Sequence, residues 1–148
     1  MDNYLDNLLS FVIPIKNEQD SIEPLVEQLI AAVRRLNNRY SAEYILIDDG
    51  STDRSWEVIN QLIARFGNLI TAIRLRRNFG KATALEVGFR EAKGSIVFTI
   101  DADLQDDPSE ISAFLEKLAE GYDVVSCWKI NRNDPLSKKI PSRIFNFA

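Results

Sequence analysis

The amino-acid sequence predicts an α/β fold, a three-layer sandwich in which helices cover both faces of a mostly parallel sheet. Three observations predict it. Short apolar runs typical of buried strands alternate along the chain with segments whose apolar residues keep helical spacing. Repeated strand, helix and strand units form right-handed crossovers, which build a parallel sheet. The length of 148 residues suits a single domain with one core.

The first elements follow from a change of apolar period. Residues 8–15 (LLSFVIPI) form a continuous apolar run, which predicts a buried strand. The apolar residues from Ile22 to Leu36 keep helical spacing and predict a helix, for which Asp20 and Glu23 suit a capping box. A second strand is predicted at 43–50 (EYILIDDG).

The pattern then repeats. A helix follows the second strand, and we expect Asp53 to cap its start and Gly67 to end it. Residues 69–75 (LITAIRL) predict a third strand. Residues 81–93 (KATALEVGFREAK) predict a helix that ends before Gly94.

The last elements are predicted in the same way. Residues 95–100 (SIVFTI) are rich in β-branched and aromatic residues, so we expect a fourth strand there. Pro108 suits the start of a helix that stops at Gly121. Residues 123–128 (DVVSCW) predict a fifth strand, and the pattern is lost from residue 129 onward.

Composition excludes several classes of function. The net charge of −4 does not favour a nucleic-acid-binding protein, and we expect no nucleic acid partner. Cys127 is the single cysteine and there is no histidine, which excludes an intrachain disulfide, a cysteine-rich zinc site and histidine-based catalysis. The chain start does not have the pattern of a signal peptide, and no apolar run has the length of a membrane-spanning helix.

Polar clusters follow four of the predicted strands. Ligands of open parallel sheets bind outside the carboxyl ends of the strands, so these clusters are expected to meet at one edge of the sheet. The clusters are KNE at 16–18, DDGSTD at 48–53, RRNFGK at 76–81 and DADLQDD at 101–107.

The fourth cluster predicts a metal site. Asp101 and Asp103 would point to one face if the strand continued, about 7 Å apart, so the chain should bend there or a ligand phosphate should complete the coordination. Gln105 adds a neutral oxygen, and oxygen donors without His or Cys favour Mg²⁺ or Mn²⁺. The alternative is solvated loop charge, with Asp106 capping the next helix.

The other clusters suit a nucleotide. Acidic residues such as Asp48 and Asp49, at the end of a strand, accept hydrogen bonds from a ribose or base in nucleotide-binding α/β folds. Asn17 and Glu18 either contact the nucleotide or form the turn into the helix. Lys81 and the nearby arginines suit a diphosphate, or they balance the aspartates.

Taken together, VIPIKNEQDSI, ILIDDGSTDRS, RNFGKATAL and DADLQDDP resemble, in order and spacing, the motifs of the inverting glycosyltransferases of family 2, which have the GT-A fold. Within that family the chain looks most similar to the polyprenyl-phosphate sugar transferases, such as dolichyl-phosphate mannose synthase and the undecaprenyl-phosphate glucosyl- and aminoarabinosyltransferases. One departure is Lys16, which stands where many members carry an aromatic residue, so base stacking is in question.

The resemblance implies a role for each motif. Asp101 and Asp103 would be the catalytic residues and, with Gln105, would bind a Mg²⁺ or Mn²⁺ ion that stabilises the departing diphosphate. The residues implied to bind a UDP- or GDP-linked sugar are Pro14, Asn17, Glu18, Asp48, Asp49, Lys81, Asp101 and Asp103.

The resemblance also implies an acceptor and a place in the cell. The acceptor would be a polyprenyl phosphate at the cytoplasmic face of the membrane, in cell-envelope glycan or lipid modification, with the chain itself soluble.

We expect a nucleotide-sugar-binding core over 1–128. Residues 129–148, with Arg132 and Arg143, would begin acceptor-side structure that continues past this chain. The tail's apolar residues make a homo-oligomer an additional expectation. Alternatives are a family 2 transferase with a saccharide acceptor and a nucleotide-binding module without catalysis.

Overall fold

The structure is a computed structural model that describes residues 7–126. The chain divides into two compact units, Met1–Ala113 and Phe114–Ala148, and the sheet belongs to the first. The predicted boundary between 1–128 and 129–148 lies outside the described residues and stays a prediction.

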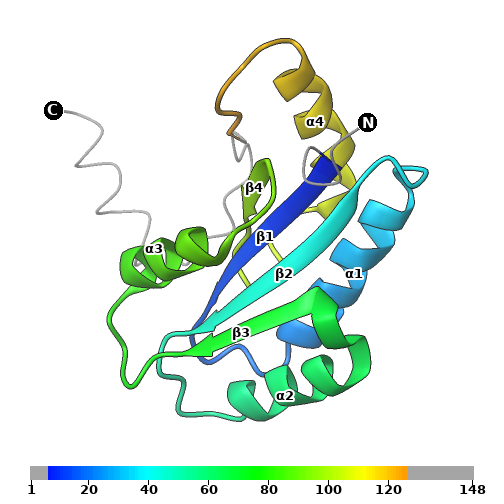
Figure 1. Ribbon diagram of the computed structural model, residues 1–148. Helices are drawn as coiled ribbons and strands as arrows, with labels where there is room; N and C mark the ends of the chain where they lie inside the picture. Colours follow the sequence, from blue (N-terminus) through cyan, green and yellow to red (C-terminus); the bar gives the residue numbers. More distant parts are fainter. Residues whose placement is uncertain (1–6, 127–148) are drawn as a thin grey trace, which may run out of the picture. The chain divides into compact units, whose positions relative to one another are not determined.

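The first unit is built on a sheet of four parallel strands in the order β3-β2-β1-β4 (Figure 1). A 3₁₀ turn precedes β3 and another precedes α4. The elements are β1 (Leu8–Ile15), α1 (Ile22–Arg34), β2 (Ser41–Asp48), α2 (Ser55–Phe66), β3 (Ile70–Arg74), α3 (Lys81–Glu91), β4 (Ile96–Thr99) and α4 (Ile111–Ala119).

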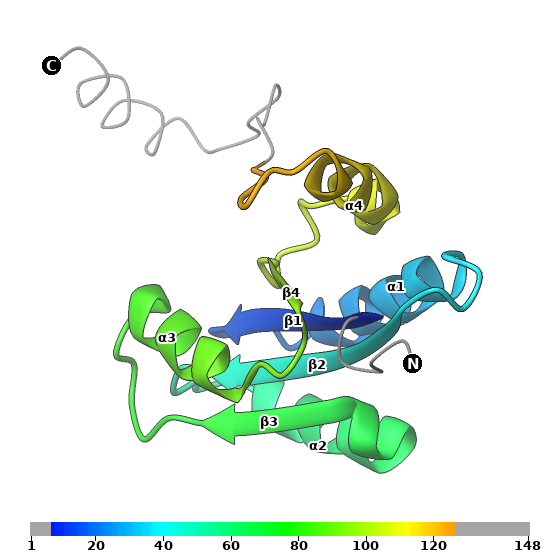
Figure 2. The same cartoon turned by 45° about the horizontal axis from the view of Figure 1, so that its top comes forward.

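Helices cover both faces of this sheet, which confirms the predicted three-layer α/β sandwich. Helices α1 and α2 lie on one face and α3 lies on the other (Figures 1 and 2). On the α3 face, Val12, Ile45, Ile47 and Ala84 form a fully buried cluster. Gly88 lets α3 approach closely, because a Cβ atom there would lie 2.3 Å from the Val12 side chain. The sheet therefore has an apolar layer against α3.

The opposite face of the sheet carries an aromatic stack. The ring of Phe11 on β1 stacks on Tyr44 of β2 at 5.3 Å and on Phe98 of β4 at 5.0 Å between centroids. Burial raises the pKa of the Tyr44 phenol well above its usual range. The stack links three neighbouring strands through side chains as well as through the backbone ladder.

The start of α1 differs from its prediction. Ser21 precedes the helix, and its hydroxyl donates hydrogen bonds to the Glu18 carbonyl oxygen and, at 2.7 Å, to the Glu18 carboxylate. The predicted capping box of Asp20 and Glu23 is wrong, because the helix starts one residue later than the box requires. Glu23 instead pairs with Arg65 of α2 at 3.2 Å. The helix also ends at Arg34, two residues before the predicted end.

Two aspartates stabilise later helix starts. The Asp53 carboxylate accepts hydrogen bonds from the Ser55 amide at 2.9 Å and the Ser55 hydroxyl at 2.6 Å, but the predicted cap is one residue too early, because Arg54 is the residue that precedes the helix. Asp107, not Asp106, caps the turn before α4, and the Ser109 amide that donates to it at 2.9 Å holds the pKa of Asp107 below its usual value. Sequence spacing alone did not distinguish the two neighbouring aspartates.

The prediction of a fifth strand at 123–128 is also wrong for residues 123–126, which the structure describes. Residues 123–126 lie outside any strand, and Val124 is 83% exposed. β-Branched residues favour a strand, but a strand forms only when its backbone pairs with a neighbour. Cys127 and Trp128 lie outside the described residues.

Candidate functional site

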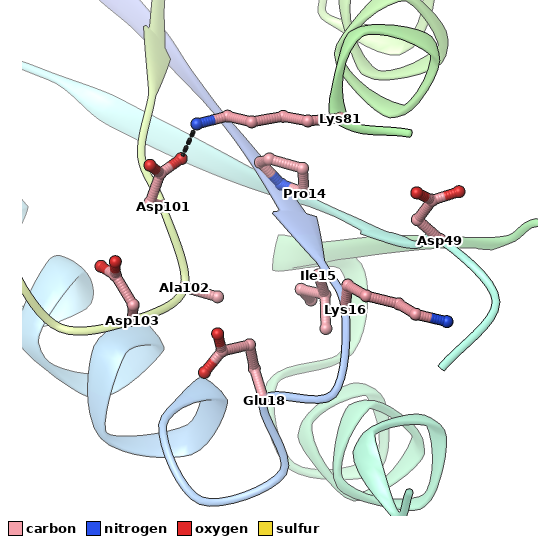
Figure 3. A pocket seen from close by; sticks show the side chains of 9 residues that line it. All are labelled: Pro14, Ile15, Lys16, Glu18, Asp49, Lys81, Asp101, Ala102 and Asp103. Atoms are coloured by element: carbon pink, nitrogen blue, oxygen red, sulfur yellow. Dashed lines mark ion pairs between the residues drawn. The ribbon is translucent and has the colours of Figure 1, made fainter. Parts of the chain in front are cut away.

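A cavity of about 200 Å³ lies where β1, β2 and β4 end at their carboxyl edge. Figure 3 shows its lining side chains, which come from the last two residues of β1, from the loops after these three strands and from the first residue of α3. Four carboxylates and two ammonium groups are among them. The lining residues are Pro14, Ile15, Lys16, Glu18, Asp49, Lys81, Asp101, Ala102 and Asp103.

The acidic side of the pocket is a bend in the chain. Strand β4 ends at Thr99, and residues 102–104 form a turn in which Leu104 has a φ of 60°. The amide of Gln105 donates to the Asp103 carboxylate at 3.1 Å, which stabilises the turn. The predicted bend is therefore confirmed, and it brings Asp101 and Asp103 to the same pocket.

Lys81 supplies the facing positive charge. Its ammonium group lies 2.5 Å from a carboxylate oxygen of Asp101, and Figure 3 shows the two side chains pointing toward each other. The Lys81 side chain is 58% exposed and that of Asp101 is 38% exposed. The ion pair therefore gives the aspartate-rich loop after β4 a positive partner from the start of α3.

Asp49 connects the second strand to the loop before Lys81. One of its carboxylate oxygens accepts the Phe79 amide at 2.7 Å, and the other accepts the Gly80 amide at 2.9 Å. Asp49 is 4% exposed. These two bonds hold the backbone immediately before α3, so Asp49 helps to place Lys81 as well as lining the pocket.

Asp48 points to the other face of the sheet. It is fully buried and accepts the Ser51 amide at 2.8 Å. Its second oxygen lies 3.1 Å from Nε of Arg74, whose guanidinium lies over the Trp56 ring of α2. Within residues 7–126 that oxygen accepts no well-directed hydrogen bond, so the contact with Arg74 is an ion pair rather than a hydrogen bond.

The loop after β1 is joined to the loop after β2. Asn17 has a φ of 56°, donates its amide to the Ser51 hydroxyl at 2.9 Å and accepts the Thr52 amide on its side chain at 2.8 Å. The Lys16 ammonium donates to the Gly50 carbonyl at 2.5 Å. These bonds tie the two loops together and direct the Asn17 side chain to Thr52.

The structure brings together six of the predicted residues: Pro14, Glu18, Asp49, Lys81, Asp101 and Asp103. Asn17, Asp48 and Gln105 are not among the lining residues, and Arg132 and Arg143 lie outside the described part. The site predictions missed Ile15 and Ala102, and they placed Lys16 at this edge of the sheet without giving it a binding role. The signal for a binding role of Lys16 was its place in the polar cluster that follows the first strand.

The pocket suits a hard divalent cation that is coordinated partly by the protein and partly by a bound phosphate. Carboxylate oxygens such as those of Asp101 and Asp103 are the donors that Mg²⁺ and Mn²⁺ prefer. In the part of the chain that the structure describes, no group of three or more His, Cys, Asp or Glu converges on one point. The residues therefore fit an ion that takes its remaining ligands from a bound diphosphate and water.

The sequence of the chain is similar to those of known glycosyltransferases. The family model described as glycosyl transferase family 2 matches residues 10–147. An undecaprenyl-phosphate 4-deoxy-4-formamido-L-arabinose transferase of Pseudomonas paraeruginosa is 41% identical over 148 residues, which is 100% of this chain and 43% of that protein. The protein of the same name in Photorhabdus laumondii is 43% identical over 93% of this chain and 42% of its own length. The chain thus spans less than half the length of these relatives.

Two solved structures have a similar fold. The mannosyltransferase PcManGT from Pyrobaculum calidifontis, in complex with GDP-Man and Mn²⁺, has a TM-score of 0.56 and 26% identity over 66% of this chain and 27% of its own. TarS from S. aureus has a TM-score of 0.58 over 87% of this chain and 23% of its own, and its 20% identity shows the fold alone. The fold is that of the GT-A glycosyltransferases.

Proposed function

Because this chain belongs to glycosyl transferase family 2, we propose that its pocket binds the nucleoside diphosphate sugar of an enzyme that transfers the sugar to a polyprenyl phosphate. The observation that carries the proposal is the opposition of Lys81 to Asp101 and Asp103 at the carboxyl edge of the sheet. A cation and a carboxylate pair at one place suit a diphosphate and a divalent metal ion together.

The donor side follows from the lining residues. The ammonium of Lys81 binds the diphosphate, and the Lys16 side chain offers hydrogen bonds to the ribose or base. Asp49 lines the pocket and holds the loop that carries Lys81. Glu18 lines the same pocket and adds a further acceptor. The donor is a UDP- or GDP-linked sugar, in line with the GDP-Man bound by the mannosyltransferase from Pyrobaculum calidifontis. Asn17 and Asp48 support the donor indirectly, because Asn17 joins the loops after β1 and β2 and Asp48 stabilises the turn at the end of β2.

The metal ion is Mg²⁺ or Mn²⁺, and Asp101 and Asp103 hold it. When bound, the ion offsets the negative charge that develops on the departing diphosphate. Gln105 donates its backbone amide to Asp103 and so keeps that carboxylate in the turn. Asp101 and Asp103 are therefore the residues on which catalysis depends most.

The acceptor is undecaprenyl phosphate or a similar lipid, as in the names of the relatives. A phosphate acceptor is already anionic, so it attacks the sugar without needing a strong general base. This agrees with a sequence that contains no histidine. The reaction belongs to the cytoplasmic face of the membrane. The described part of the chain contains no helix long and apolar enough to cross it.

The donor proposal is tested by calorimetry. UDP and GDP are titrated into the protein with and without Mn²⁺, and the better nucleotide is repeated with Asp103→Ala and with the exposed control Asp123→Ala. We expect Mn²⁺-dependent binding that weakens at least tenfold, about 1.4 kcal/mol, in Asp103→Ala and stays unchanged in the control. Binding of equal strength with and without Mn²⁺, or in both variants, would contradict the proposed site.

The acceptor proposal needs the whole protein. Transfer from the nucleotide sugar is measured with undecaprenyl phosphate and, separately, with a saccharide acceptor. We expect product with the lipid phosphate. Transfer to the saccharide alone would refute the acceptor assignment and leave the donor site intact.

A further inference from the structure

The ion pair between Lys81 and Asp101 uses two groups that the proposed function needs for other partners. The Lys81 ammonium contacts Asp101. With donor bound, Asp101 serves the metal ion and Lys81 serves the diphosphate. Asp101 cannot bind the metal ion at full affinity while the Lys81 ammonium occupies one of its carboxylate oxygens. Lys81 likewise cannot bind the diphosphate at full affinity while it is paired with Asp101.

The backbone that carries Lys81 is held firmly. Asp49 accepts the amides of Phe79 and Gly80, the two residues before Lys81, and Asp49 itself is almost completely buried. The backbone therefore keeps its place while the Lys81 side chain, with four rotatable bonds and 58% exposure, is free to change partner.

The ion pair is also weak enough to exchange. Both side chains are partly exposed, and ion pairs of this kind contribute about 0.2–1 kcal/mol, because water competes for both charges. A divalent cation carries twice the charge of the ammonium and has the hard-oxygen preference that carboxylates satisfy. The contact therefore opposes metal binding by a modest, measurable amount.

We propose that the Lys81–Asp101 ion pair is an exchange contact that couples metal binding to diphosphate binding. The metal ion displaces Lys81 from Asp101, and the released ammonium binds the diphosphate. This inference rests on the proposed donor site and adds a role for Lys81 before the donor arrives.

The coupling is reciprocal. A metal ion that binds alone must break the ion pair, and so must a diphosphate that recruits Lys81 alone. When both bind, the pair is broken once, so each ligand strengthens the binding of the other. The pair's share of this coupling is about 1.4- to 5-fold in affinity. Direct contact between the metal and the diphosphate adds to it.

Lys81→Met tests this exchange, because it removes the charge and keeps the length of the side chain. We expect Mn²⁺ alone, followed by the electron paramagnetic resonance signal of the free ion, to bind about 1.4- to 5-fold more tightly than to the unmodified protein. The better of UDP and GDP, titrated in the presence of Mn²⁺, should bind about tenfold more weakly, because a charged hydrogen bond is lost. The exchange is recognised by opposite changes in the two affinities, tighter for Mn²⁺ and weaker for the nucleotide. A merely structural role of Lys81 would weaken the binding of both ligands.

Two further variants control the experiment. Lys117 matches Lys81 in exposure, at 57%, and also pairs with one carboxylate, Glu120, at 2.9 Å. Lys117→Met removes the same charge and should leave both affinities unchanged. Lys81→Arg keeps the charge, so it should keep Mn²⁺ affinity within twofold of the unmodified protein.

The outcomes separate this inference from the proposed function. If the unmodified protein binds nucleotide in a Mn²⁺-dependent way but Lys81→Met binds Mn²⁺ alone no more tightly, the exchange is wrong and the donor site stands. If Lys117→Met tightens Mn²⁺ equally, the effect is net charge and the exchange is again wrong. If the unmodified protein shows no Mn²⁺-dependent nucleotide binding, both fail.

Discussion

The turn after β2 is predicted to tolerate no side chain at Gly50. This residue has a φ of 66°, and a Cβ atom there would lie 2.4 Å from the Arg77 carbonyl carbon and 2.7 Å from the Arg77 Cα. Both are backbone atoms, so no rotamer change relieves the overlap. Gly50→Ala must move either the turn or the loop that leads to Lys81.

The expected loss of stability has two parts. A non-glycine residue at positive φ carries strain of about 1–3 kcal/mol. Overpacking against a neighbour that cannot move aside costs about 1–3 kcal/mol more. The sum, about 2–6 kcal/mol, is a large part of the 5–15 kcal/mol that stabilises a typical domain.

Urea unfolding of two glycine variants measures the cost of overpacking against the Arg77 backbone. Gly67 also has a positive φ, 56°, but a Cβ atom there would meet nothing within 4 Å. Gly67→Ala therefore carries backbone strain alone. We expect Gly50→Ala to lose about 1–3 kcal/mol more than Gly67→Ala, and to bind nucleotide more weakly because the loop before α3 shifts. Equal losses of stability would refute the close approach.

Two further predictions concern the core and pH. Phe11→Ala should lower the free energy of unfolding by about 3–5 kcal/mol, because Phe11 is fully buried and stacks on two rings; a loss below about 1 kcal/mol would contradict the packing. Desolvation raises the pKa of Asp53, but the hydrogen bonds from Ser55 and Gln19 outweigh it and hold the pKa below its usual value. A lowered pKa means that these bonds stabilise the fold at neutral pH and that the contribution is lost as pH falls through the folded-state pKa. Asp53→Ala should therefore cost about 1 kcal/mol at pH 7 in urea unfolding and less below that pKa; the same loss at every pH would argue against it.

Much of the fold was predictable because it depends on local pattern. Strand β1 was predicted to the residue at 8–15, since a strand covered on both faces is a continuous apolar run. The location of the site was predictable too, because polar clusters that follow parallel strands must meet at one edge. The bend at Asp101 and Asp103 followed from the distance that a straight strand would impose.

The tertiary structure decided which segments pair as strands and which way individual side chains point. Residues 123–126 have strand propensity, yet they lie outside any strand, because propensity does not supply a partner. Asp48 and Asp49 are adjacent and chemically identical, but Asp48 faces Arg74 and Asp49 faces the loop before Lys81. A strand that is apolar on both faces carries no alternation to mark which carboxylate faces the pocket.

The sequence by itself therefore determined the class of fold, the edge that holds the site and the chemistry of the groups gathered there. The contact of Lys81 with Asp101 and the turning of Asn17 toward Thr52 were decided only when separate segments met. The physical reason is that apolar period and residue type are local properties, whereas the partner of a side chain depends on backbone that arrives from elsewhere in the chain.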